Sequence, residues 1–504
     1  MTSTKPKIYR EFAATVEIFR ALASRQQRRP PGPAMPASDD RQAATARLSR
    51  TELSVDFTTV DFTTTRRTFL AAALAAPALG ALAACGSSGP SRPGDSGGGG
   101  VGSASYWFLT SQPQEGIRTD TVNRFNKANP DNQIQITAFQ NDAFKTKIKT
   151  AIGAGQAPTL IFGWGGGTLR SYVDAGQVDD LTSWFDENPA AKNRLFPTAF
   201  APATVDNKIY AMPAEVVQPV VLYYNKEVFD NVGAAPPQSW GDIMDLVPKF
   251  NAAGIAPFSL GGQSRWTEMM WLEFLFDRIG GPEVFEAAYN GEQNAWSNPA
   301  AIDALTRVQD LIKADGFVRG FSSITADSNA DQALLYTGKA AMMLHGSWTY
   351  GGMSTDGGDF VSSGKLGYMN FPAVDGGRGD LTDTVGNPAQ YLSIYSKATD
   401  EQKEAAKKFL STAVLSDDEV KQWIDIGSVP IVQGTQNELG ASKDAEFLEF
   451  IYQVSTDAKV FAQSWDQALS PTAAETLLDN IARLFQLSIG PQQFADNMNQ
   501  AIGK

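Results

Sequence analysis

The stretch TLIFGWGGGTLRSYVDAGQVDDLT, residues 159–182, joins a short apolar run to three glycines and then to an amphipathic segment. The apolar run at 159–164 is typical of a buried strand, and the segment after the glycines is typical of a helix. The glycines at 165–167 allow a sharp turn and a close approach of the backbone to a ligand. The stretch therefore predicts a strand that ends at Trp164, beside a turn suited to binding.

Strands and helices alternate before this stretch. Residues 104–110 and 133–140 are predicted strands, and residues 116–130 and 142–158 are predicted amphipathic helices that end at proline or glycine. This order is typical of an α/β domain with a largely parallel sheet. Ligands of such domains bind beyond the carboxyl ends of the strands. The loops expected at that edge are residues 110–115, 140–144 and 163–168.

The second half of the chain is predicted to be mostly helical, with short strands between the helices. Residues 220–224 form an apolar run typical of a strand, and Ser239 is expected to cap a helix that ends near Gly254. The apolar segment at 330–348 is interpreted as helical up to His345, and Trp348 follows where that helix ends. The tail from Asp400 is also predicted to be helical.

An apolar segment near the N-terminus, residues 69–82, follows Arg66 and Arg67 and precedes Cys85, the only cysteine. Fourteen residues are too few for a membrane-spanning helix, which needs about 20, but they fit the apolar region of an export signal. The arginine pair resembles a twin-arginine signal, and the sequence LAAC at 82–85 resembles a bacterial lipobox. Residues 1–84 are therefore the expected leader and signal peptide. The alternative is a buried helix that ends in an inert thiol.

Cleavage at the lipobox would leave Cys85 lipidated at the start of a Gly- and Ser-rich segment, residues 85–104. Chains of this composition are flexible tethers. The lipid on Cys85 would then be the expected membrane anchor.

The charge of the chain is unevenly distributed. The 504 residues include 42 Lys and Arg against 55 Asp and Glu, but residues 1–84 hold 12 basic and 7 acidic residues. The remainder is therefore acidic, with 30 basic and 48 acidic residues. An acidic surface disfavours a nucleic-acid partner and binding to anionic lipid.

Metals and cofactors are not expected. One cysteine excludes an internal disulfide, and one histidine, His345, excludes a histidine-rich metal site. A lone imidazole on an apolar segment is expected to be a core residue. Asp327, Asn329 and Asp331 imitate the start of a calcium loop, but the glycine and glutamate required later in that loop are missing.

Several further segments carry a family resemblance. In order along the chain they are APTLIFGWGGGTLRSYVDAGQVDDLT, KIYAMPAEVVQPVVLYYNKEVFDNVG, PPQSWGDI, GKAAMMLHGSW, GYMNFPAVDG and SDDEVKQW. This series resembles the extracellular solute-binding lipoproteins of bacterial ABC sugar importers, in the oligosaccharide-binding group. The chain looks most similar to actinobacterial proteins that bind xylobiose and xylo-oligosaccharides.

The resemblance implies an α/β, periplasmic-binding-protein-like fold with two lobes, a hinge and a ligand cleft between the lobes. Lobe one would comprise residues 105–212 and 371–415, and lobe two residues 213–370 and 416–504. The implied function is that of a non-enzymatic, monomeric receptor that captures an oligosaccharide and delivers it to ABC permease subunits. It would act on the extracellular face of the cell membrane, after twin-arginine export and lipid anchoring through Cys85.

A sugar site needs flat aromatic rings for C–H faces and fixed polar groups for hydroxyls. The expected ligand-binding residues are Trp164, Gly165, Trp348, Trp266, Asp142, Gln112, Glu115, Glu215, Gln218, Glu268, Asn387, Tyr391 and Trp465. Each has a structural alternative: the tryptophans are also candidates for the core, and Asp142 is also a candidate helix cap. Of Trp266 and Trp271, one is expected in the core. The tryptophans expected to be structural are Trp107, Trp184, Trp240, Trp296 and Trp423.

Two other functions stay open at this point. A lipid-anchored secreted glycosidase would need two carboxylates about 5–10 Å apart, and the chain has many acids. A surface module that binds another protein would have no affinity for small sugars.

Overall fold

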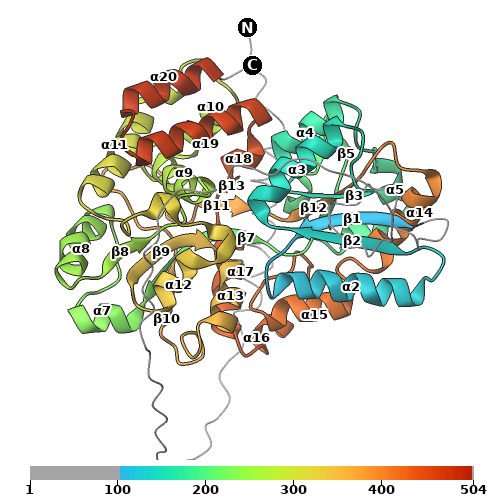
Figure 1. Cartoon of the computed structure of the whole chain (residues 1–504), viewed down its shortest axis with the longest axis horizontal. Coiled ribbons are helices and arrows are strands. Elements are labelled where there is room, and N and C mark those ends of the chain that lie inside the picture. Colours follow the sequence, from blue (N-terminus) through green and yellow to red (C-terminus); the bar gives the residue numbers. More distant parts are fainter. Residues whose placement is uncertain (1–102, 502–504) are drawn as a thin grey trace, which may run out of the picture.

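The structure is a computed structural model that describes residues 103–501. The expected leader, Cys85 and nearly all of the expected tether lie outside the described residues. The described chain forms two α/β lobes that lie side by side (Figure 1). No helix among residues 103–501 is both long and apolar enough to cross a membrane.

Lobe one is built on a five-stranded sheet with the order β2-β1-β3-β12-β6. β1 pairs in parallel with β2 and β3, and β12 runs antiparallel to β3 and β6. The predicted alternation of strands and helices is confirmed here. The elements are β1 (Ala104–Leu109), α2 (Gln114–Ala128), β2 (Ile134–Phe139), α3 (Asn141–Gly153), β3 (Leu160–Gly163), α4 (Gly166–Asp174), α5 (Thr182–Glu187), α6 (Pro189–Asn193), β4 (Thr204–Val205), β5 (Lys208–Ile209), β6 (Met212–Ala214), β12 (Gln390–Ile394), α14 (Asp400–Thr412) and α15 (Asp417–Asp425).

Lobe two is built on a six-stranded sheet in which β7 pairs with β9, β10 and β11. Its strands are β7 (Gln218–Asn225), β8 (Ala256–Ser259), β9 (Ala340–Gly346), β10 (Leu366–Met369), β11 (Thr384–Asn387) and β13 (Phe461–Gln463). The helices after these strands are α7 (Lys226–Val232), α8 (Trp240–Ala252), α9 (Trp266–Gly280), α10 (Pro282–Tyr289), α11 (Pro299–Lys313), α12 (Ala330–Tyr336), α13 (Thr349–Asp356), α16 (Gln436–Gly440), α17 (Ala445–Asp457), α18 (Trp465–Ala468), α19 (Pro471–Phe485) and α20 (Pro491–Ala501). Ser239 caps α8 with a reciprocal capping box, as predicted.

Two short links connect the sheets, and we call residues 215–217 and 388–389 the hinge. The first link joins β6 to β7, and the second joins β11 to β12. A later segment braces the first link, because Val217 N–H donates to the Val429 carbonyl at 3.0 Å and Ile431 N–H donates to the Glu215 carbonyl at 3.1 Å. The chain thus passes between the lobes through closely spaced extended segments.

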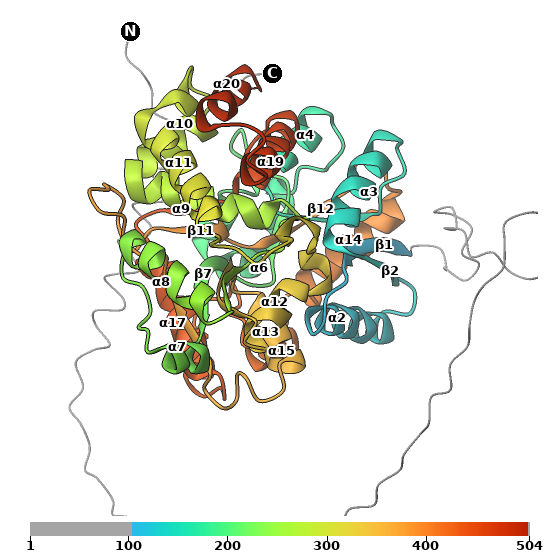
Figure 2. The ribbon, with the colours of Figure 1, turned by 60° about the vertical axis from the view of Figure 1, so that its left-hand side comes forward.

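The lobe membership of two segments differs from the expected boundaries. β11, placed by the expectation in lobe one, pairs with β7 and β13 in the sheet of lobe two. α15, expected in lobe two, packs on α2 of lobe one, with Trp423 fully buried there (Figure 2). Each link is only two or three residues long, and sequence patterns do not locate so short a crossing.

The helix predicted from residue 330 to His345 is confirmed only in its first part, α12 (Ala330–Tyr336), and is wrong for the second part, which forms the strand β9. Every residue of β9 is buried, since the strand lies between β7 and β8 in the sheet. A strand buried on both faces has a continuous apolar sequence that periodicity does not distinguish from a buried helix. The correction moves His345 and the Trp348 that follows it to the end of a central strand.

Candidate functional site

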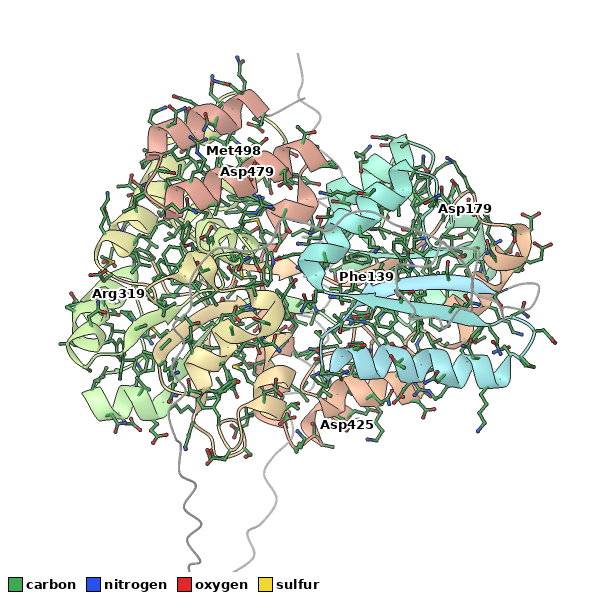
Figure 3. The ribbon with its side chains drawn as sticks, viewed as in Figure 1. Phe139, Asp179, Arg319, Asp425, Asp479 and Met498 are labelled. Atoms are coloured by element: carbon green, nitrogen blue, oxygen red, sulfur yellow. The ribbon has the colours of Figure 1, made fainter. Side chains whose placement is uncertain are left out.

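Two adjoining cavities lie between the lobes, an inner one of about 140 Å³ and an outer one of about 600 Å³. Both are lined by side chains of each lobe, and they share Lys145, Phe162, Trp164, Trp266, Asp466 and Gln467. Phe139, the last residue of β2, lies on the side of lobe one that faces lobe two (Figure 3). The cavities therefore lie at the carboxyl ends of the parallel strands, where the sequence predicted a site.

Three tryptophans surround the place where the cavities meet. Trp266 and Trp348 come from lobe two and are half-buried, with ring centroids 6.1 Å apart and planes inclined by 48°. Trp164 comes from lobe one, is 9% exposed, and packs edge-on against Phe144 and Phe162. Inclined aromatic rings around a cavity offer flat faces to the C–H groups of a ligand.

Charged groups join the lobes beside these rings. Lys145 Nζ on α3 donates to Asp466 Oδ2 on α18 at 2.7 Å. The same ammonium lies 5.1 Å from the centroid of the Trp164 ring and 5.9 Å from that of Trp266, within cation–π range. Lys145 therefore contacts one tryptophan of each lobe and also forms an ion pair between the lobes.

Asp142 also bridges the lobes. Its Oδ1 accepts from Trp266 Nε1 at 3.2 Å, and its backbone N–H donates to Asp327 Oδ2 at 3.1 Å. Burial, together with the nearby charge of Asp142, raises the pKa of Asp327 above its ordinary value. Asp142 lies in the first turn of α3 and makes no capping bond to that helix, so its side chain is used between the lobes.

Two backbone carbonyls beside the tryptophans accept from glutamines of the opposite lobe. Gln114 Nε2 donates to the Trp348 carbonyl at 2.8 Å, and Gln463 Nε2 donates to the Trp164 carbonyl at 2.6 Å. Together with the bonds of Lys145 and Asp142, these contacts hold the lobes against each other in this structure.

Amide side chains dominate the polar lining of the inner cavity. Three of them, Gln332, Asn387 and Gln390, have a buried side-chain oxygen without a hydrogen-bond partner. Leaving such an acceptor unpaired costs about 1–3 kcal/mol, and ligand hydroxyls would donate to it. The full set of lining amides is Gln112, Gln114, Asn141, Gln218, Asn329, Gln332, Asn387, Gln390 and Gln467.

The cavities bring together nine of the thirteen residues that the sequence proposed for the site. Trp164 and Trp266 line both cavities; Asp142, Gly165 and Tyr391 line the outer one; and Gln112, Gln218, Asn387 and Trp348 line the inner one.

Two residues that line the outer cavity, Tyr391 and Gly165, also have close contacts within lobe one. The Tyr391 hydroxyl donates to the Ala199 carbonyl at 2.9 Å. Gly165 has φ = 76°, and a Cβ there would lie 2.6 Å from the Pro202 carbonyl oxygen, so the predicted need for glycine at this turn has a steric basis.

The other four residues do not line either cavity. The Glu115 carboxylate accepts from the Thr110 hydroxyl, and both oxygens of Glu215 accept from Arg118 at 2.7 and 2.8 Å. Glu268 is 1% exposed, and burial raises its pKa well above the ordinary value. Trp465 is fully buried in lobe two.

Sequence reasoning proposed Asp142 and Trp266 but missed the other side chains that join the lobes, which are Lys145, Asp466, Asp327, Gln114 and Gln463. Lys145 stands three residues after Asp142, on the same helix turn, and Asp327 and Asn329 were weighed only as calcium ligands. His345 lines the inner cavity. Within residues 103–501, no three potential metal ligands lie close enough to hold a metal ion together.

The sequence of the chain matches the model of a known protein family. The family described as bacterial extracellular solute-binding protein matches residues 110–421. The chain belongs to this family. The periplasmic-binding-protein-like fold that the sequence predicted for this solute-binding protein is therefore confirmed.

Curated relatives of this solute-binding protein are distant. A probable sugar-binding periplasmic protein of Mesorhizobium japonicum is 29% identical over 56% of this chain and 64% of its own length. The multiple sugar-binding protein of Streptococcus mutans is 23% identical over 66% of this chain and 76% of its own length. The chain spans 64%, 55% and 61% of the lengths of the first three curated relatives it matches.

Solved structures extend the likeness to most of the chain. A protein studied for xylan utilization by the thermophilic bacterium Caldanaerobius polysaccharolyticus is 30% identical, with a TM-score of 0.72. The match covers 80% of this chain and 100% of that one. A chitin oligosaccharide binding protein, 24% identical with a TM-score of 0.71 over 80% of this chain and 98% of its own, shares the fold.

Proposed function

We propose that this solute-binding protein is the sugar receptor of a bacterial ABC importer and binds a short neutral oligosaccharide between its lobes. The observation that carries the proposal is the combination of three tryptophan rings with buried, unpartnered amide oxygens in one interlobe cavity. The rings suit the apolar faces of a sugar, and the amides suit its hydroxyls. The names of the relatives, several of which are sugar-binding proteins, support the same class of ligand.

The expected ligand is xylobiose or a longer xylo-oligosaccharide. Amides far outnumber charged side chains around the inner cavity, which favours a neutral ligand. The small volume of that cavity, about 140 Å³, favours a terminal ring without a bulky substituent, and the outer cavity of about 600 Å³ has room for the rest. The likeness to a protein studied for xylan utilization supports this choice.

Calorimetric titration tests the ligand directly. We expect micromolar dissociation constants, about −8 kcal/mol, for xylobiose and xylotriose. We expect binding at least tenfold weaker for N,N′-diacetylchitobiose and maltose. If diacetylchitobiose bound more strongly than xylobiose, the ligand class would be chitin oligosaccharides and not xylo-oligosaccharides. No binding of any sugar would favour the protein-binding module instead.

The receptor is proposed to be non-enzymatic. Each acid that lines the cavities already accepts a bond from the protein, which favours structural roles: Asp142 from Trp266, Asp327 from the Asp142 N–H, Asp466 from Lys145 and Glu475 from Arg265. Incubation with xylotriose, followed by chromatography of the products, is expected to return xylotriose unchanged. Release of xylose at an enzymatic rate would favour the glycosidase.

Export and anchoring are also proposals. The twin-arginine pattern at Arg66 and Arg67 and the lipobox cysteine support a receptor held outside the membrane, as a monomer, beside its permease. In cells fed a labelled fatty acid, we expect label on the wild-type protein and none on Cys85→Ala. Equal labelling of both proteins would show that Cys85 does not carry the lipid.

A further inference from the structure

His345 occupies an unusual place for the only histidine of the chain. It lies on β9, is 2% exposed, and lines the inner cavity. Its ring packs edge-on against Trp266, with centroids 5.4 Å apart, and against Trp348, with centroids 5.5 Å apart. The imidazole is therefore a common support for two of the rings that surround the cavity.

The hydrogen bonds of His345 define its neutral tautomer. Nδ1 accepts the backbone N–H of Gly346 at 2.9 Å, so this nitrogen carries no proton. The ring proton is then on Nε2, which lies 3.3 Å from Asp331 Oδ2. Asp331 is fully buried, and its other oxygen accepts the N–H of Gln332 at 2.9 Å.

The contact between His345 and Asp331 is not a well-formed hydrogen bond in this structure. Nε2 of the histidine and Oδ2 of the aspartate are both buried without an aligned partner. Buried polar atoms in this state are costly and call for a role. Gln332, whose backbone is bound to Asp331, also presents an unpartnered oxygen to the inner cavity.

We propose that His345 is a positioning residue for the ligand: its neutral imidazole sets the angle between Trp266 and Trp348, and protonation of that imidazole weakens sugar binding. The inference rests on the proposed function, since it takes a sugar to be the ligand of these rings. It assigns to the histidine a role that goes beyond filling the core.

Protonation would disturb the ring because of the tautomer. A second proton would have to sit on Nδ1, where it would face the N–H of Gly346, and two donors cannot bond to each other. The ring would turn away from Gly346, and Trp266 and Trp348, which pack on its faces and edges, would move with it. The angle between the two platforms would then no longer fit a sugar.

Several ionisable groups lie around His345. Asp331 on α12 faces its Nε2, with Oδ2 3.3 Å away. The other ionisable groups near the cavity are Glu268 on α9, and Arg118, Lys145, Asp327 and Asp466 on its lining.

The coupling has a thermodynamic signature. A ligand that binds better to the neutral form must lower the pKa of the imidazole, because the two equilibria are linked. A tenfold difference in affinity between the two forms corresponds to one pKa unit. The dissociation constant for sugar should therefore rise as pH falls through the imidazole pKa.

Proton NMR of the untagged exported protein tests this coupling, because the chain contains one imidazole and its ring protons are assigned without further labelling. We expect the titration of its ring protons to move to lower pH when xylobiose is bound. We also expect the dissociation constant from calorimetry to rise up to tenfold at acid pH. Identical titration curves with and without bound sugar would overturn the proposal.

The variant His345→Gln keeps a side-chain donor that can reach Asp331 and cannot titrate. We expect its affinity at pH 7.5 to fall, because the ring that supports Trp266 and Trp348 is lost, and the further loss of affinity at acid pH to be abolished. A variant with lowered thermal stability but the wild-type pH profile would reduce His345 to a structural residue. Trp296→Phe, in the core of lobe two, is the matched control and should retain the wild-type profile.

A readout without sugar separates this proposal from the proposed function. Tryptophan fluorescence of the ligand-free protein should change with pH in step with the NMR titration, because His345 contacts Trp266 and Trp348. The change should be missing from His345→Gln. If the fluorescence follows the imidazole but no sugar binds at any pH, the ligand class fails and the positioning of the rings stands. If the fluorescence ignores the imidazole, the positioning fails whatever the ligand.

Discussion

Two groups of three tryptophans use the same side chain in opposite ways. The cleft group, Trp164, Trp266 and Trp348, draws on both lobes and lies beside polar atoms and open volume. The core group, Trp271, Trp296 and Trp465, belongs to lobe two and is fully buried. The difference shows that neighbouring residues decide the role of a tryptophan. It can bind a ligand where its neighbours leave one face of the ring open, and it is a core residue where phenylalanines cover both faces.

The packing of the core group makes this concrete. Trp465 stacks on Phe285 with centroids 4.8 Å apart, and it meets Phe276 at 4.9 Å and Trp296 at 5.1 Å. In the cleft group, the Trp266 and Trp348 rings are 6.1 Å apart and only partly buried. Stability should therefore depend on the first group and affinity on the second.

The largest expected effect is that of Trp465→Ala on stability. Removing a fully buried tryptophan leaves a cavity, and such truncations cost about 3–5 kcal/mol. Denaturant unfolding measures this loss, while calorimetry on the folded protein should give a wild-type dissociation constant for sugar. A tenfold weaker affinity with little loss of stability would transfer Trp465 to the cleft group. Trp465→Phe, which retains a ring, should lose less.

A pH effect on stability is expected next, at a carboxyl that contacts the core group. Glu273 Oε1 accepts the N–H of Trp465 at 2.6 Å, and burial raises the pKa of Glu273 to about 8. The folded protein therefore holds this proton more tightly than the unfolded chain does. This contribution to stability is complete below about pH 4.5, the ordinary value, and is lost as pH rises towards 8.

The slope of that loss is at most about 1.4 kcal/mol per pH unit for one proton. Urea unfolding across this range should show the decline in wild type and a flatter profile in Glu273→Gln, which cannot ionise. Parallel profiles would mean that Glu273 is not the group responsible.

Truncation in the cleft group should act on affinity. We expect Trp348→Ala to weaken sugar binding at least tenfold, about 1.4 kcal/mol, and to lower the thermal transition less than Trp465→Ala does, because the Trp348 side chain is only partly buried. Trp164→Ala should weaken binding similarly, with a lower transition temperature, since it also removes contacts with Phe144 and Phe162. If both variants bound sugar with wild-type affinity, the tryptophans of the cleft group would not be binding residues.

The smallest effect is expected from the ion pair that joins the lobes. Lys145 and Asp466 have side chains 23% and 7% exposed, so their attraction is only partly screened by water. A double-mutant cycle with Lys145→Met and Asp466→Asn, measured on the free energy of sugar binding, should give a coupling of about 0.5–1 kcal/mol. Zero coupling would mean that the pair does not contribute to ligand capture.

The sequence was sufficient for the three parallel strands of lobe one and for the edge at which the site lies. β1, β2 and β3 have clear apolar patterns, and helices with sharp ends separate them, so the parallel order and the loop edge follow from local signals. The same signals did not identify β9 as a strand. Both of its faces are buried, so its sequence does not alternate between apolar and polar residues.

The contacts across the cleft were not predictable in the same way. Asp466 is 321 residues from Lys145, and Asp327 is 185 residues from Asp142. No local pattern marks such partners, and amides such as Gln332 and Gln467 are common in any loop or strand. The sequence placed Trp465 in the cleft, but the structure buries it. Its burial depends on Phe285 and Trp296, which come from distant parts of lobe two, so no local pattern indicates it.

The shortness of the hinge has a mechanical consequence. Links of three and two residues leave almost no slack, so the halves of the molecule can swing about an axis through both links but cannot slide apart. Gln218, Asn387 and Gln390 adjoin these links, and their mutual spacing would barely change during a swing. A sugar would therefore contact these amides first, and the ion pair between Lys145 and Asp466, where the two cavities meet, would form last.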